Sequence, residues 1–83
     1  MTERDLKALG FKRNDVTAEE SGYPEDWYYY TYDLDKTLSL ISSCNDEAKK
    51  EGWFVEFFDV EGIRFTSYIQ LADLIDLINK AKR

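Results

Sequence analysis

Apolar side chains near the end of the chain recur at helical spacing. The apolar positions are Leu71, Leu74, Ile75 and Ile78. Their i, i+3, i+4, i+7 spacing places them on one face of a helix. Ser67 followed by Gln70 forms an S-x-x-Q capping box, so the pattern predicts a helix that begins directly after Ser67. Polar residues between the apolar ones, such as Asp73 and Asp76, are expected to face water.

A second, shorter helix is predicted over residues 3–9. Thr2 is a suitable N-cap, with Asp5 three residues later, and Gly10 follows the last helical residue. A glycine there can take the left-handed conformation that ends many helices, and Phe11 could then contact Leu6. A helix of seven residues is not stable alone in water, so it must pack on the rest of the fold.

Between the helices, alternating and aromatic-rich segments predict strands. We expect a weak strand over 11–16 and further strands over 27–34, 37–43, 53–59 and 63–66. Residues 17–26 are predicted to be a polar loop, and 44–51 a loop or a helical turn. Because the connections are short, the strands should form an antiparallel meander. The predicted architecture is one α+β domain over residues 1–83, with an antiparallel sheet of four to five strands flanked by the two helices.

Period-two alternation assigns the strand residues to two faces of the sheet. The face toward the long helix is predicted to carry Tyr28, Tyr30, Tyr32, Leu34, Leu38, Leu40, Trp53, Val55, Phe57, Ile63 and Phe65. The opposite face, called here the aromatic face, comprises Trp27, Tyr29, Ile41, Phe54 and Phe58. Four exposed aromatic side chains, each of roughly 150–250 Å², could exceed the largest apolar patch of a typical monomer, so something should cover this face.

The sequence leaves two possibilities for what covers the aromatic face. The short helix and the 17–26 loop could fold over it, or a partner protein or second copy of the chain could bind there. Burial of Trp27, Phe54 and Phe58 within one chain would contradict the second interpretation.

Composition removes most enzyme classes. The 83 residues include no histidine and one cysteine, Cys44. There is consequently no Ser-His-Asp or Cys-His pair, no histidine metal ligand and no intramolecular disulfide. Two acidic clusters, Asp33 with Asp35 and residues 45–47, lack the spacing of an EF-hand loop. We therefore expect a protein that is not an enzyme and has no metal and no cofactor.

Charge is the other unusual feature. With 17 acidic and 11 basic residues the net charge is −6, which disfavours direct binding to nucleic acid or to an anionic membrane. A candidate acidic patch comprises Glu25, Asp26, Asp33 and Asp35, which flank the tyrosines of the 27–34 strand. Carboxylates interleaved with aromatics could imitate a nucleic acid and block a nuclease or DNA-binding protein. The simpler interpretation is an aromatic strand with solvated ends.

The order of Leu9-Gly10-Phe11, an aromatic strand, the segments 38–42, 53–58 and 63–66, and a Leu/Ile helix resembles small uncharacterised proteins of bacteriophages and prophages. The resemblance implies an accessory role and transfers no catalytic residue. The charged N-terminal segment and the unpaired cysteine predict a cytoplasmic protein. The function expected from these observations is a protein–protein interaction module that uses the aromatic face to bind a partner protein or a second copy of the chain. The acidic nucleic-acid mimic is the alternative.

Overall fold

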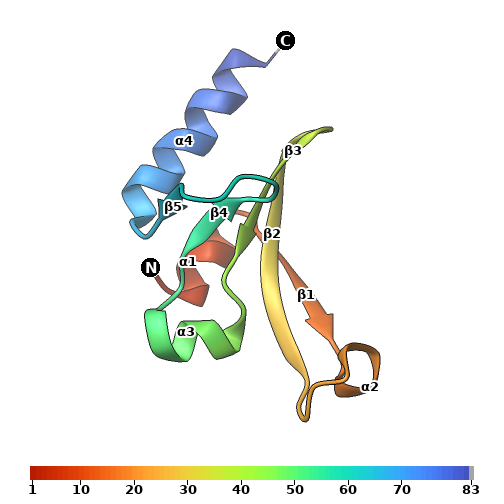
Figure 1. The fold of residues 1–83 in the computed structure, drawn as a ribbon. Coiled ribbons are helices and arrows are strands. Elements are labelled where there is room, and N and C mark those ends of the chain that lie inside the picture. Colours follow the sequence, from red (N-terminus) through yellow and green to blue (C-terminus); the bar gives the residue numbers. More distant parts are fainter. Residues whose placement is uncertain (83) are drawn as a thin grey trace.

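A computed structural model describes residues 1–82 of the chain (Figure 1). The elements, in chain order, are α1 (Glu3–Ala8), β1 (Lys12–Val16), α2 (Ala18–Ser21), β2 (Trp27–Asp35), β3 (Leu38–Ser42), α3 (Asn45–Glu51), β4 (Val55–Phe57), β5 (Arg64–Phe65) and α4 (Tyr68–Ala81). The strands form one five-stranded sheet in the order β1-β2-β3-β4-β5, and every neighbouring pair is antiparallel. The predicted α+β fold with an antiparallel meander is confirmed.

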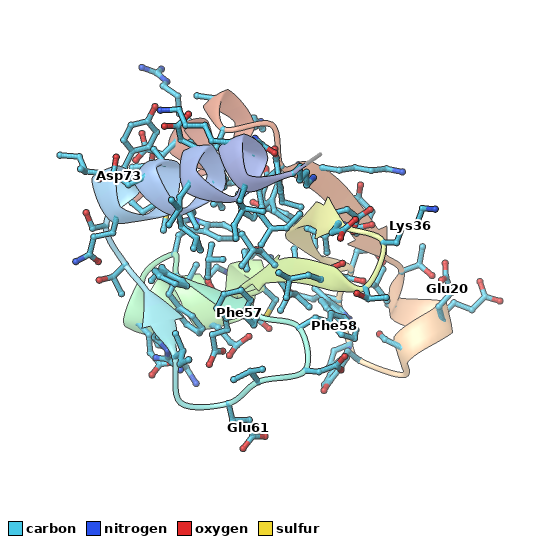
Figure 2. The ribbon with its side chains drawn as sticks, turned by 90° about the horizontal axis from the view of Figure 1, so that it is seen from above. Glu20, Lys36, Phe57, Phe58, Glu61 and Asp73 are labelled. Carbon is cyan, nitrogen blue, oxygen red and sulfur yellow. The ribbon has the colours of Figure 1, made fainter. Side chains whose placement is uncertain are left out.

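The core lies on the sheet face that α1 and α4 share. Figure 2 shows both helices on one side of the sheet and the loop of Glu61 on the other. The buried core residues are Leu6, Phe11, Tyr30, Leu34, Leu40, Val55, Leu71 and Ile75. Leu74 and Ile78 pack against this core, so the predicted inward face of the long helix is confirmed. The predicted orientation of the even-numbered residues of β2 is also confirmed.

The ends of α1 form as the sequence predicts. The Thr2 side chain accepts the Asp5 backbone N–H, and the Asp5 carboxylate accepts the Thr2 N–H at 3.0 Å. At the other end, Gly10 has a φ of +97° and the Phe11 N–H donates to the Leu6 carbonyl at 3.0 Å. This is the 6→1 bond of a Schellman motif, and it turns the chain so that Leu6 and Phe11 both enter the core.

Two segments outside the predicted strands and helices, 17–26 predicted as a loop and 44–51 as a loop or a helical turn, contain short helices. Within 17–26, Thr17 caps the four-residue α2, which ends at Gly22 in the left-handed conformation. The segment 44–51 forms α3, where the Glu47 side chain accepts the Cys44 N–H at 3.2 Å. Both helices are too short to show apolar periodicity, so the prediction of a loop for 17–26 was wrong in part.

The last two strands are shorter than predicted. β4 begins at Val55 rather than at residue 53, and β5 contains only Arg64 and Phe65. Ile63 precedes β5 and is 47% exposed, so its predicted place in the core was wrong. The predicted capping box of α4 is half formed, because the structure records only the bond from the Gln70 N–H to the Ser67 hydroxyl.

Candidate functional site

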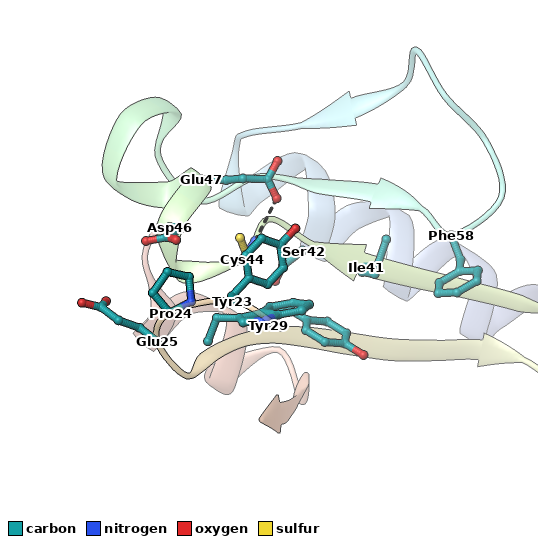
Figure 3. Close-up of a pocket in the computed structure, with 11 residues that line it drawn as sticks. Tyr23, Pro24, Glu25, Tyr29, Ile41, Ser42, Cys44, Asp46, Glu47 and Phe58 are labelled. Atoms are coloured by element: carbon teal, nitrogen blue, oxygen red, sulfur yellow. Dashed lines mark hydrogen bonds between the residues drawn. The ribbon is translucent and has the colours of Figure 1, made fainter. Parts of the chain in front are cut away.

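A cleft of about 770 Å³ lies on the aromatic face of the sheet (Figure 3). Its volume is within the range of ligand-binding pockets, roughly 300–1,000 Å³. It is lined by Tyr23, Pro24, Glu25, Trp27, Tyr29, Ile41, Ser42, Cys44, Asp46, Glu47 and Phe58. Four of the five residues predicted for the aromatic face, all except Phe54, therefore line one cleft.

The cleft forms where β3 separates from β2. The β2–β3 ladder ends at the pair Thr31 and Ile41. Beyond it, the Tyr30 N–H donates to the Ser42 hydroxyl at 2.8 Å, and the Tyr28 N–H donates to Asn45 Oδ1 at 3.0 Å. These side chains replace the missing strand partner and hold the start of α3 beside β2. Two odd-numbered residues of β2, Trp27 and Tyr29, line the cleft that results.

Aromatic rings form one wall of the cleft. The Trp27 and Tyr29 ring centroids lie 5.6 Å apart, and Tyr23 packs edge-on against Trp27 at 6.1 Å. Tyr23 comes from the segment between α2 and β2 and is 63% exposed, whereas Trp27 and Tyr29 are half-buried. The indole N–H of Trp27 is buried and finds no acceptor among residues 1–82. An unpaired buried donor costs about 1–3 kcal/mol.

Phe54 does not contribute to the exposed surface, contrary to its predicted role in the interaction face. It is only 3% exposed, and the guanidinium of Arg64 lies 3.7 Å from its ring centroid. Arg64 is itself held by an ion pair with Glu51 at 3.7 Å. Phe58, in contrast, is 60% exposed. Burial of all three test residues would have contradicted the exposed-face interpretation, and that burial is not observed.

The cover expected from the short helix is absent. α1 packs on the opposite side of the sheet, because Leu6 belongs to the core there and Leu9 packs against it. Only Tyr23, Pro24 and Glu25, from the predicted 17–26 loop, reach the cleft, and they line one end of it. Within the described residues, no helix lies across the aromatic face.

The candidate acidic patch is divided between the two ends of β2. Glu25 lines the cleft, and Asp26 accepts the Ala18 N–H at the start of α2 at 2.7 Å. At the other end, Asp33 accepts the Ser39 hydroxyl and Asp35 accepts the Lys36 N–H, both at 2.8 Å. Asp33 lies seven positions after Asp26, about 24 Å along an extended strand, so the four carboxylates do not form one continuous surface.

The cleft has an acidic rim that differs from the predicted patch. Besides Glu25, this rim contains Asp46 and Glu47 from α3. Sequence reasoning missed Asp46, Glu47, Tyr23 and Cys44 as site residues because they lie outside the predicted strands. The Cys44-x-x-Glu47 spacing resembles a capping box and was the one signal of a helix start there, although cysteine is not a preferred N-cap.

Other polar groups of the fold are structural. The Tyr30 and Tyr28 hydroxyls donate to the two carboxylate oxygens of Glu3, at 2.8 and 3.1 Å. Burial, assisted by this carboxylate, raises the pKa of Tyr30 to about 12 and also raises the pKa of Tyr28. Both phenols thus stay neutral and tie α1 to β2. Residues 1–82 contain no group of three or more cysteine or acidic residues arranged to hold a metal ion.

No helix in the described part of the chain is long and apolar enough to cross a membrane. Comparison of the chain with protein-family models, with curated proteins and with solved structures yields no significant match. The resemblance to small phage proteins therefore stays a prediction, and a proposal about function must rest on the cleft.

Proposed function

We propose that this chain is a non-enzymatic interaction module that binds a partner protein in the cleft on its aromatic face. The observation that carries the proposal is the cleft itself, which groups Trp27, Tyr29, Ile41 and Phe58 on a sheet face that no described helix covers. Concave apolar surfaces of this kind are preferred places for binding.

Phe58 can contribute a large part of the binding energy. It is 60% exposed, which for an aromatic side chain of 150–250 Å² leaves roughly 90–150 Å² to be buried by a partner. At about 25 cal/mol per Å² this burial is worth roughly 2–4 kcal/mol, or at least about thirtyfold in affinity. Exposed aromatic anchors beside a pocket are typical of binding hot spots.

A pair of matched variants tests the proposal. Phe58→Ser removes the anchor, whereas Ile69→Ser removes a similarly exposed apolar residue, 69% exposed, from the outer side of α4. A partner captured from bacterial lysate would be identified by mass spectrometry and its affinity for each purified variant measured by calorimetry. We expect Phe58→Ser to weaken binding by at least about thirtyfold and Ile69→Ser to have little effect. Equal affinities for both variants and the wild type would contradict the proposal.

The acidic-mimic alternative has weaker support, because the four predicted carboxylates lie at opposite ends of β2 and three of them bond to the fold's own groups. It predicts a different result in the same experiment. Capture of a nucleic-acid-binding protein that is lost in Asp33→Asn/Asp35→Asn, but not in Phe58→Ser, would favour the mimic.

A further inference from the structure

The cleft is polarised along its length. Figure 3 shows Glu25, Asp46 and Glu47 at one end and Ile41 and Phe58 at the other. None of the described residues that line the cleft is basic. We infer, on the basis of the proposed function, that the occupant is an extended peptide segment of the partner that places a lysine or arginine at the carboxylate end and an apolar side chain beside Phe58.

The carboxylate end has the groups that recognise a cation. Glu47 uses Oε1 to accept the Cys44 N–H, which leaves its other oxygen available. Asp46 pairs with Lys49 at 3.9 Å, but both side chains are more than 70% exposed and such a pair is weak. The rings of Tyr23 and Trp27 line the same cleft as these carboxylates, and a cation within about 6 Å of an aromatic face is attracted to it.

The dimensions of the cleft set the spacing of the two side chains. Phe58 lies beside Ser39, whose carbonyl accepts the Phe58 N–H at 3.0 Å, and the acidic end begins at Cys44. Cys44 lies three positions after Ile41 and five positions after Ser39, or about 10–17 Å of extended chain. A peptide lying along the cleft should therefore carry its basic and apolar residues about three to five positions apart.

Charge also favours a different protein over a second copy of this chain. Two copies that paired their clefts face to face would bring six rim carboxylates together, and each copy has a net charge of −6. Like charges in an interface suppress association, whereas a basic segment is attracted to the acidic rim.

In vitro selection from a library of random 12-residue peptides, with the full chain as bait, tests the inference. Affinities of the selected peptides would be measured by fluorescence polarisation at low salt. The variant Glu25→Gln/Asp46→Asn/Glu47→Gln neutralises the rim. The control variant Glu19→Gln/Glu61→Gln/Asp73→Asn changes the net charge equally at exposed positions outside the cleft. We expect enrichment of lysine or arginine three to five residues from an apolar side chain, and roughly five- to thirtyfold weaker binding to the rim variant than to the control variant.

The outcomes separate the inference from the proposed function. Peptides that depend on Phe58 but lack basic residues, or that bind both charge variants equally, would overturn the inference and leave the proposed function standing. A selection that returns no peptide sensitive to Phe58→Ser would count against both. Selection of peptides that match this chain's own sequence would show that a second copy is the occupant.

Discussion

The contact between Glu3 and two tyrosines should account for a large part of the stability that α1 gives to the fold. Tyr30 is fully buried, and its hydroxyl donates to Glu3 Oε1 at 2.8 Å. Glu3→Ala removes this acceptor and leaves a buried donor without a partner, which costs about 1–3 kcal/mol. Tyr28 is only half-buried, so its hydroxyl can bond to water instead and adds less.

We therefore expect Glu3→Ala to lower the free energy of unfolding by roughly 2–3 kcal/mol. For a chain of this size this corresponds to a decrease in Tm of about 10–20 °C. Urea denaturation followed by circular dichroism would give the free energy directly. Glu3 also lies in the first turn of α1, where a negative charge stabilises the helix by about 0.3–1 kcal/mol. The single variant Glu3→Ala therefore overestimates the free energy that the hydrogen bonds to the tyrosines contribute.

A double-mutant cycle with Tyr30→Phe isolates the hydrogen bond, because the helix-dipole effect of Glu3 is the same in both backgrounds. We expect Tyr30→Phe to destabilise the wild type by about 1–2 kcal/mol but to stabilise Glu3→Ala, because in that background it removes the buried hydroxyl that has lost its acceptor. Glu3→Gln, which keeps an acceptor without the charge, should fall between wild type and Glu3→Ala. A coupling energy below about 0.5 kcal/mol would refute the reasoning.

Three further predictions concern pH, backbone geometry and the aromatic face. The pKa of Tyr30 is raised from about 10 to about 12, so the folded state keeps a proton that the unfolded chain releases. The free energy of unfolding should therefore fall as the pH rises from 10 to 12, and Tyr30→Phe should lack this decrease when its denaturation is measured across the same pH range. Gly10→Ala puts a side chain on a residue with a φ of +97° and places its Cβ 3.4 Å from the Tyr32 ring. Chemical denaturation should therefore show a free energy of unfolding about 1–2 kcal/mol below that of the wild type, and a wild-type value would contradict the left-handed geometry. In the same assay, Phe54→Ala should lower the free energy of unfolding by about 3–5 kcal/mol and Phe58→Ala by less than about 1 kcal/mol, because Phe54 is buried and Phe58 is exposed. The reverse order would show that the two side chains have been assigned to the wrong environments.

The sequence was sufficient to predict the elements in which local and long-range signals agree. In β2, the alternation of aromatic and polar residues placed Tyr30 in the core and Tyr29 on the opposite face, and the structure confirms both. The turn at Gly10 was predictable because positive φ and an apolar residue at the next position are local requirements of one motif. α2 was not predictable from periodicity, because four residues span scarcely more than one turn.

The cleft could not be predicted, because it depends on where β2 and β3 stop pairing with each other. Alternation assumes that neighbouring strands remain paired, but β3 leaves β2 after Ile41 and side chains of Ser42 and Asn45 take over its hydrogen bonds. Alternation also gave no sign that Phe54, which precedes β4, would be covered by Arg64 from the next strand. A period of two in the sequence assigns a face, but it does not say whether another side chain covers that face.

The two uses of tyrosine in β2 explain why this small chain carries so much aromatic surface. Tyr28 and Tyr30 turn toward the helices, where one carboxylate of α1 satisfies both hydroxyls and lets large rings fill the core. Trp27 and Tyr29 turn the other way, where they line the cleft and no described helix covers them. One strand thus links the group that stabilises the fold to the wall of the cleft. Substitutions on the helix side should lower the stability of the whole molecule. Truncation of Phe58, which lines the cleft, should instead leave stability nearly unchanged and reduce binding. Because the two effects are separate, the proposed function can be tested by substitution.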